Sequence, residues 1–189
     1  MSRIVAAACA AAVALVCITS RAVAAESMPR LQGRYDNRAQ VAAHAADAPP
    51  LVTVTIEPVP QADFSLWRVH LQTDPDSTFE QTWAMLARVE HDGSGALIPY
   101  YQLRQDAPPA ASAFDPAQWL SLEACALRGD FHAARIEAMA EGEPCVAVSM
   151  SVGARRALMP VAVVSEGDAL AIDLNLRGVR TRIDAKRVR

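Results

Sequence analysis

The sequence predicts an all-β fold, a closed antiparallel β-barrel with short helices. Apolar residues recur at every second position along most of the chain, which is the period of a half-buried strand. Turn-forming dipeptides separate these runs at short intervals, as antiparallel hairpins require. A barrel also leaves no exposed sheet edge, whereas a two-sheet β-sandwich, which is the alternative, leaves several.

The N-terminus is predicted to be a cleavable signal peptide over residues 1–25. Arg3 precedes an uncharged stretch over residues 4–18, and residues 22–24 read Ala-Val-Ala, a small-x-small cleavage signal. A membrane-spanning helix needs about 20 apolar residues, and this stretch is shorter. We therefore expect a periplasmic or secreted protein that consists of one domain, residues 26–189, and has no membrane span after cleavage.

Two of the chain's 4 cysteines, Cys9 and Cys17, would leave with the signal peptide. The remaining pair, Cys125 and Cys145, is expected to form a disulfide in an oxidising compartment. Two cysteines and scattered histidines do not have the ligand spacing of a structural zinc site, so no metal is expected.

Charge argues against a nucleic-acid partner. Of the 18 basic residues, Arg3 and Arg21 lie in the expected signal peptide, which leaves 16 basic residues against 21 acidic ones. A domain with this acidic balance lacks the electrostatic footprint of nucleic-acid recognition. Its length suits one domain with its own hydrophobic core, and it contains no internal repeat.

Strands are predicted from alternation, and the clearest case is the run in which Val52, Val54 and Ile56 alternate with polar residues. After the last glycine, the pattern predicts a closing hairpin. The further predicted strands are residues 67–72, 79–90, 146–152, 170–176 and 179–184.

Turns and helices complete the prediction. Asp- and Gly-containing turns are expected at residues 74–77, 92–93, 141–142 and 166–167. Short helices are expected at residues 38–46 and 115–122; in the second, Asp115 can cap the helix and Pro116 occupies its first turn.

Catalytic motifs are missing from the sequence: it has no nucleophile elbow, zinc-protease helix, phosphate-binding glycine loop or dinucleotide fingerprint. If the barrel contains a cavity, aromatic and polar residues of the central runs are the candidates to line it. Ordinary core packing is the alternative role for each of them, because small barrels are often filled by their own side chains. The candidates are Trp67, Phe79, Gln81, Trp83, Tyr100 and Tyr101.

The opening of the domain has the pattern Gly-x-aromatic-x-Asn-x-x-Gln, formed by Gly33, Tyr35, Asn37 and Gln40. Together with a strand near Trp67, a segment that leads into Cys125 and a later Pro-Cys at Cys145, this pattern resembles the CpcT/CpeT family of phycobiliprotein chromophore lyases. The resemblance covers most of residues 31–188. It implies a calycin-like antiparallel barrel, often dimeric, that binds a linear tetrapyrrole and attaches it to a cysteine of a partner protein.

One departure from the family concerns activity. Where the lyases carry Pro-Tyr-Arg-x-Arg, residues 78–82 read Thr-Phe-Glu-Gln-Thr, so both arginines that would hold a bilin's propionates are missing. Phycobiliproteins are also assembled in the cytoplasm, whereas this chain has an export signal. We therefore expect a barrel that binds a small, partly apolar molecule without lyase activity; a bilin lyase is the alternative.

Overall fold

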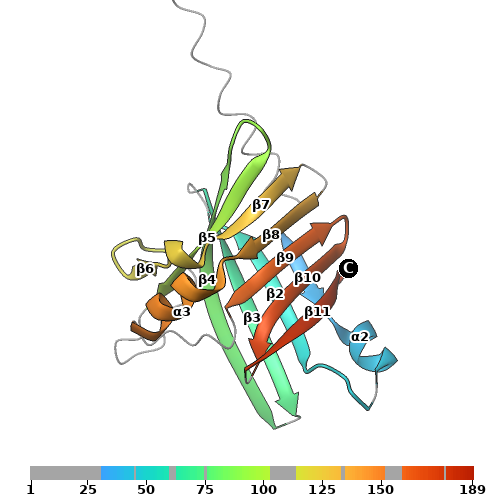
Figure 1. Ribbon diagram of the computed structural model, residues 1–189. Coiled ribbons are helices and arrows are strands. Elements are labelled where there is room, and N and C mark those ends of the chain that lie inside the picture. Colours follow the sequence, from blue (N-terminus) through green and yellow to red (C-terminus); the bar gives the residue numbers. More distant parts are fainter. Residues whose placement is uncertain are drawn as a thin grey trace, which may run out of the picture.

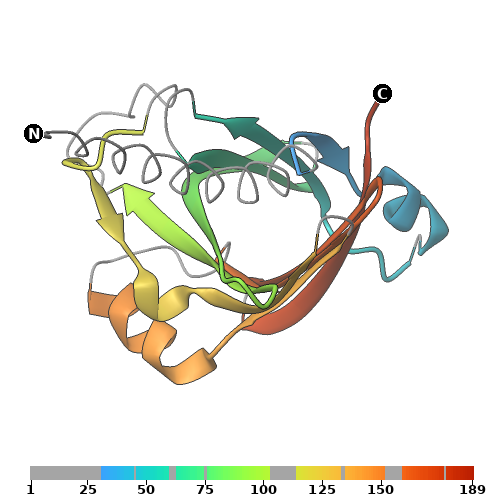
Figure 2. The ribbon, with the colours of Figure 1, turned by 90° about the horizontal axis from the view of Figure 1, so that it is seen from above.

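The computed structural model is a closed barrel of ten antiparallel strands (Figures 1 and 2). It describes residues 31–44, 46–59, 63–74, 76–102, 114–132, 135–151, 159–176 and 178–189. The strands follow the order β4-β3-β2-β1-β11-β10-β9-β8-β7-β5, and pairing of β5 with β4 closes the ring, while β6 attaches to β5. The predicted all-β barrel is confirmed. The predicted signal peptide, residues 1–25, lies outside the described residues.

Consecutive strands are joined mainly as hairpins, as the turn residues predicted. Gly93 and Gly167 have positive φ angles of 88° and 59°, which glycine adopts without strain. The strands are β1 (Gly33–Asp36), β2 (Leu51–Pro58), β3 (Phe64–Asp74), β4 (Ser77–Val89), β5 (Ser94–Gln102), β6 (Trp119–Ser121), β7 (Leu127–His132), β8 (Arg135–Ala140), β9 (Pro160–Glu166), β10 (Ala169–Leu176) and β11 (Val179–Arg187).

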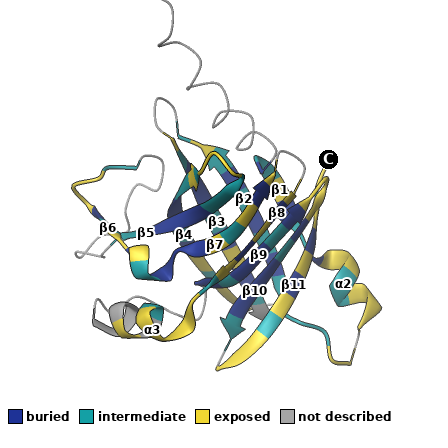
Figure 3. Cartoon of the chain, turned by 45° about the horizontal axis from the view of Figure 1, so that its top comes forward, coloured by how far each residue is buried: buried dark blue, intermediate teal, exposed yellow. Residues whose placement is uncertain are grey.

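Alternation along each strand directs one set of side chains into the barrel and the other set outward. In β2, Val52, Val54 and Ile56 are buried in the main core, as predicted, and Figure 3 shows such buried positions along the strands. A second, smaller cluster lies on the outer face of β3 and β4. It contains Leu66, Ala84 and Trp119, packed against Phe64, Tyr100 and Phe114.

Two helices and one 3-10 turn flank the barrel. The helices α2 (Arg38–Ala43) and α3 (Gly142–Ser151) lie outside the ring of strands and apart from each other (Figures 1 and 2), and η1 (Glu123–Cys125) precedes β7. The predicted helix at residues 38–46 is confirmed as α2, with an earlier end. Over the described part of the chain, no helix is long and apolar enough to span a membrane.

The strand predicted at residues 146–152 is wrong, because α3 occupies this part of the chain up to Ser151. Val146 and Val148 imitate strand alternation, but Glu143 and Pro144 form a helix start: an acidic residue and a proline are both favoured in the first turn. The turn predicted at residues 141–142 is accordingly the beginning of α3.

The helix predicted at residues 115–122 is also wrong. Asp115 does accept a hydrogen bond, from the Ala117 N–H at 3.0 Å, but it closes only one turn. The chain then forms β6, because Trp119 is buried in the outer cluster and Leu120 pairs with Tyr101 of β5. Tertiary contacts therefore outweigh the local capping signal.

Candidate ligand-binding site

The inner wall formed by β3 and β4 carries four of the six predicted lining residues. Trp67 lies directly opposite Trp83, and the next inward-facing pairs are Val69 with Gln81 and Leu71 with Phe79. Residues two apart on a strand share a face, so Phe79, Gln81 and Trp83 form one continuous inward row on β4. Both tryptophans are fully buried, and Gln81 is only 8% exposed.

The two tryptophans of this wall differ in their hydrogen bonding. The Trp67 indole N–H donates to Ser65 Oγ at 2.9 Å, within the same strand. The Trp83 indole nitrogen is equally buried but has no hydrogen-bond partner in the described structure. Burial normally requires such a partner for a polar group, so Trp83 is an exception within its own wall.

Gln81 is a second exception, two residues from Trp83 on the same face. Neither its amide nitrogen Nε2 nor its carbonyl oxygen Oε1 has a hydrogen-bond partner among the described residues, and neither atom is in contact with solvent. Leaving a buried polar group unpaired costs about 1 to 3 kcal/mol. The inward row of β4 therefore carries two donors and one acceptor that have no partner in the described structure.

Gln81 and Trp83 lie on the part of β4 where the pairing with its neighbouring strands changes. The strand β4 pairs with β3 over nearly its whole length, but with β5 only from Ala84 to Val89. In the described structure, the segment Ser77–Trp83 has a strand partner on one side only. Over this segment, β4 is joined to the described strands through β3.

Tyr100 and Tyr101, the other predicted lining residues, point to opposite faces of β5. Tyr101 is partly buried and packs against the main core, on the face of β5 that points into the barrel. Tyr100 lies on the outer face, where its ring contacts Phe64 and Phe114 at centroid distances of 5.2 Å and 5.4 Å. The structure therefore brings Tyr101 to the interior side, together with the β3 and β4 row, but places Tyr100 in the outer aromatic cluster.

Glu80 and Thr82, which stand where the lyases carry arginines, face away from the barrel interior. They alternate with the buried row on β4; Glu80 Oε2 lies 3.9 Å from His70 Nδ1 on the outer face, and Thr82 is opposite Arg68. The Glu80 charge and the Thr82 hydroxyl therefore do not face a ligand inside the barrel.

The opening motif joins the first strand to the last. The Arg187 guanidinium lies over the Tyr35 ring, 4.9 Å from its centroid, and Arg187 Nη2 donates to Tyr35 Oη at 2.7 Å. Burial raises the pKa of Tyr35, which the nearby Arg187 charge partly offsets. Gly33 has a φ of 144°, and a Cβ there would clash with the Arg187 guanidinium. Gly33 and Tyr35 thus form part of the joint between β1 and β11.

Arg187 was not singled out from the sequence. The sequence does contain a signal for it. Arg187 continues the alternation of Ile183 and Ala185, so a charged residue stands at a position of β11 that faces the barrel interior. Among the described inward-facing strand positions it is the charged one, and all three of its nitrogens have partners. Nη1 donates to the Gln32 carbonyl, Nη2 to Tyr35 Oη, and Nε lies 3.2 Å from Asp168 Oδ1.

Asn37 and Gln40 complete the motif and are structural in their contacts. Asn37 is fully buried; it donates to the Pro50 carbonyl at 3.0 Å and accepts from the Val52 N–H at 2.8 Å. Gln40 instead reaches β11, where Nε2 donates to the Arg182 carbonyl at 3.0 Å and Oε1 accepts from the Asp184 N–H at 3.1 Å. These bonds attach α2 to the barrel.

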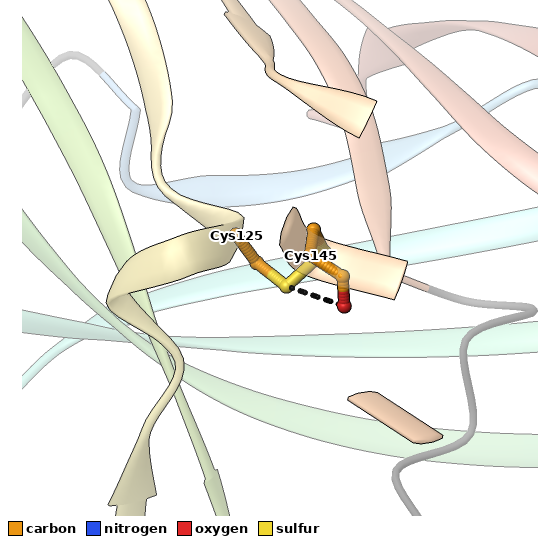
Figure 4. The surroundings of a disulfide bond; sticks show 2 residues. All are labelled: Cys125 and Cys145. Carbon is orange, nitrogen blue, oxygen red and sulfur yellow. Dashed lines mark hydrogen bonds between the residues drawn. A yellow bond between two sulfur atoms is a disulfide. The ribbon is translucent and has the colours of Figure 1, made fainter. Parts of the chain in front are cut away.

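The predicted disulfide between Cys125 and Cys145 is present and joins η1 to α3, with the two Cα atoms 4.4 Å apart (Figure 4). Cys125 belongs to the main core, whereas Cys145 is half-buried beside it. The dashed line in Figure 4 marks the 3.6 Å approach of Cys125 Sγ to the Cys145 carbonyl oxygen. Within the described ranges, no three His, Cys, Asp or Glu side chains gather as metal ligands would.

Comparison with known proteins returned no match: no family model, no curated protein and no solved structure is significantly similar to this chain. The geometry of the site therefore carries the functional argument.

Replacing Gln81 by leucine should stabilise the protein. The substitution removes two unpaired buried polar atoms and keeps a similar volume, so we expect the free energy of unfolding to rise by about 1 to 2 kcal/mol in chemical denaturation. The exposed Gln118, replaced by leucine in the same way, should change it by less than about 0.5 kcal/mol. A destabilised Gln81→Leu protein would mean that the Gln81 amide has partners in solution.

Proposed function

We propose that this protein is an exported small-molecule-binding β-barrel, a divergent relative of the CpcT/CpeT chromophore lyases that does not retain lyase activity. The observation that carries the proposal is the pair of unpartnered polar side chains inside the barrel, Gln81 and Trp83. These side chains lack the stabilising contribution of hydrogen bonds, and a ligand that supplies those bonds would stabilise the protein.

Binding in this barrel requires side chains to move, because the unpaired atoms are packed out of contact with solvent. We propose that the part of β4 that carries Gln81 moves to admit the ligand, while the pairs that β4 makes with β5, from Ala84 to Val89, stay in place. The ligand then rests against the inward faces of Trp67 and Phe79, where apolar contact adds to its affinity.

Lyase activity is not part of the proposal, because the residues that would support it are missing. Glu80 and Thr82, at the positions of the family's strand arginines, face outward, so neither position supplies a cation to the barrel interior. Arg187, the charged residue at the inward positions, already uses its three nitrogens on Gln32, Tyr35 and Asp168. A bilin's two propionates would thus meet no available cation among the described inward-facing residues.

Mass spectrometry of the exported protein tests the proposal. Under native conditions we expect a fraction of the protein to exceed its denatured mass by one small molecule, and Gln81→Leu material, purified in parallel, to lose this adduct. The denatured mass should also show a chain that begins at Ala25 or Glu26 and lacks the two thiol hydrogen atoms of Cys125 and Cys145. An adduct-free native protein, with no ligand recovered by solvent extraction, would contradict the binding function.

Export and lyase activity have separate readouts. A chain that keeps its first 25 residues would contradict export and leave binding intact. Incubation with a linear tetrapyrrole and a cysteine-containing acceptor should produce no covalent chromophore on the acceptor; its appearance would restore the lyase alternative.

A further inference from the structure

We propose that the Gln81–Trp83 site takes an uncharged ligand with an amide-type edge, that is, an N–H beside a C=O, on a flat apolar body. This inference rests on the proposed binding function and adds the chemical class of the ligand. It follows from the hydrogen-bonding groups that lack partners, from the charges around them and from the wall that they share.

The unpaired groups are complementary to an amide edge. The Gln81 side chain offers a donor, Nε2, beside an acceptor, Oε1, and both are without partners in the described structure. A ligand N–H can donate to Oε1 while the adjacent ligand C=O accepts from Nε2, which satisfies both atoms with one functional group. The second lone pair of the same carbonyl can accept a hydrogen bond from the Trp83 indole N–H, which has no acceptor in the described structure.

Charge excludes most other polar ligands. A carboxylate or phosphate buried here needs a cation, and at the described inward positions the charged residue is Arg187, whose nitrogens are all engaged. A cationic ligand finds no carboxylate on the inward faces of β3 and β4 either. Because an unpaired buried charge costs far more than a hydrogen bond can return, the ligand is neutral.

The wall around the polar groups is aromatic and aliphatic. Trp67 stands opposite Trp83, and Leu71 and Phe79 form the next inward pair beyond Gln81. Trp67 already donates its N–H to Ser65, so it presents only its apolar ring. A flat ring system against this wall buries apolar surface while its amide edge reaches Gln81.

Three probes of nearly equal size separate these requirements: 2-quinolinone, which has the amide edge; naphthalene, which lacks it; and 2-naphthoate, which carries a negative charge. Binding is followed by tryptophan fluorescence and by the indole N–H resonances of the purified protein. We expect 2-quinolinone to bind at least about tenfold more tightly than naphthalene, because a net gain equal to one hydrogen bond already gives that factor. The naphthoate should bind most weakly.

Variants assign the preference to residues. Gln81→Leu should bind 2-quinolinone no more tightly than naphthalene, because the ligand N–H is then buried without an acceptor. Thr82→Val, on the outer face of the same strand, should keep the preference. On addition of 2-quinolinone the Trp83 indole N–H resonance should shift more than that of Trp67, whose bond to Ser65 is retained. Thermal unfolding of each variant shows that it is folded before it is titrated.

Each outcome has a distinct meaning. Equal binding of 2-quinolinone and naphthalene by the unmodified protein, or tighter binding of the naphthoate, overturns the ligand class but leaves a binding barrel in place. Retention of the preference in Gln81→Leu overturns the assignment to Gln81. Failure of all three probes to bind, together with an adduct-free native mass, overturns the proposed function itself.

Discussion

Asn37→Ala should lower the free energy of unfolding by about 3 kcal/mol, one of the two largest effects that we expect from this structure. The Asn37 side chain is fully buried and bonds two backbone groups at the start of β2, the carbonyl of Pro50 just before the strand and the N–H of Val52 within it. Alanine leaves both without that partner, and each unsatisfied buried group costs about 1 to 3 kcal/mol. The melting temperature should fall by about 6 to 12 °C, measured by circular dichroism.

Asn175→Ala provides the matched control. Asn175 is a partly buried asparagine whose Oδ1 has no hydrogen-bond partner in the described structure, so its removal should cost less than about 0.5 kcal/mol. Ligand binding should be unchanged in Asn37→Ala below its melting temperature, because Asn37 is a structural residue of the α2 connection. A protein with unchanged stability and lost ligand binding would reverse this assignment.

Removal of the disulfide should cost a similar amount, about 3 kcal/mol in the chain-entropy model. The bond closes a loop between residues separated by 20 positions, and its loss lets the unfolded chain explore more conformations. Cys125→Ala with Cys145→Ala should therefore unfold at a lower denaturant concentration than the unmodified protein. A reducing agent should destabilise the unmodified protein to about the same extent and leave the double variant unchanged.

Hydrogen exchange locates the effect of the disulfide. The helix α3 contacts η1 more extensively than any other described element, and the disulfide joins these two elements. Reduction should therefore accelerate hydrogen exchange of the α3 amides first. Exchange in the barrel strands β10 and β11 should increase only as much as the global loss of stability requires. Equal acceleration in α3 and in the strands would show that the bond acts entirely on the unfolded chain.

Asn37 and Gln81 are two buried amide side chains of the barrel that differ in their hydrogen bonding. The Asn37 amide has protein partners for both its nitrogen and its oxygen, so it adds to stability. The Gln81 amide has none in the described structure, and its replacement by leucine should stabilise the protein while it removes ligand binding. In the proposed function, the unpaired Gln81 amide is the group that bonds the ligand.

Alternation in the sequence predicted β2, β3, β4, β10 and β11, because burial of one face imposes a period of two on a half-buried strand. The other five barrel strands, β1, β5, β7, β8 and β9, were not predicted individually. Val52, Val54 and Ile56 are all buried in β2, as their spacing required. The same reasoning failed for residues 146–152, where valines at alternate positions lie in α3. A short run of alternating valines does not distinguish a strand from a helix that begins with Glu143 and Pro144.

The sequence was sufficient to predict part of the candidate site. Alternation placed Trp67, Gln81 and Trp83 on strands, and the cysteine count paired Cys125 with Cys145, as the structure shows. The sequence could not say that Tyr100 faces outward, because nothing local identifies which side of β5 is covered by the outer aromatic cluster.

By itself the sequence determined the fold class, the strand periodicity and the disulfide pair, since these depend on residue types and spacings along the chain. Only the tertiary structure decided which polar groups lack partners. Trp67 and Trp83 have the same side chain and the same burial, yet Ser65 satisfies one while no described group satisfies the other. Whether a buried donor is paired depends on what the register and closure of the barrel bring within about 3 Å of it, and that information is not local.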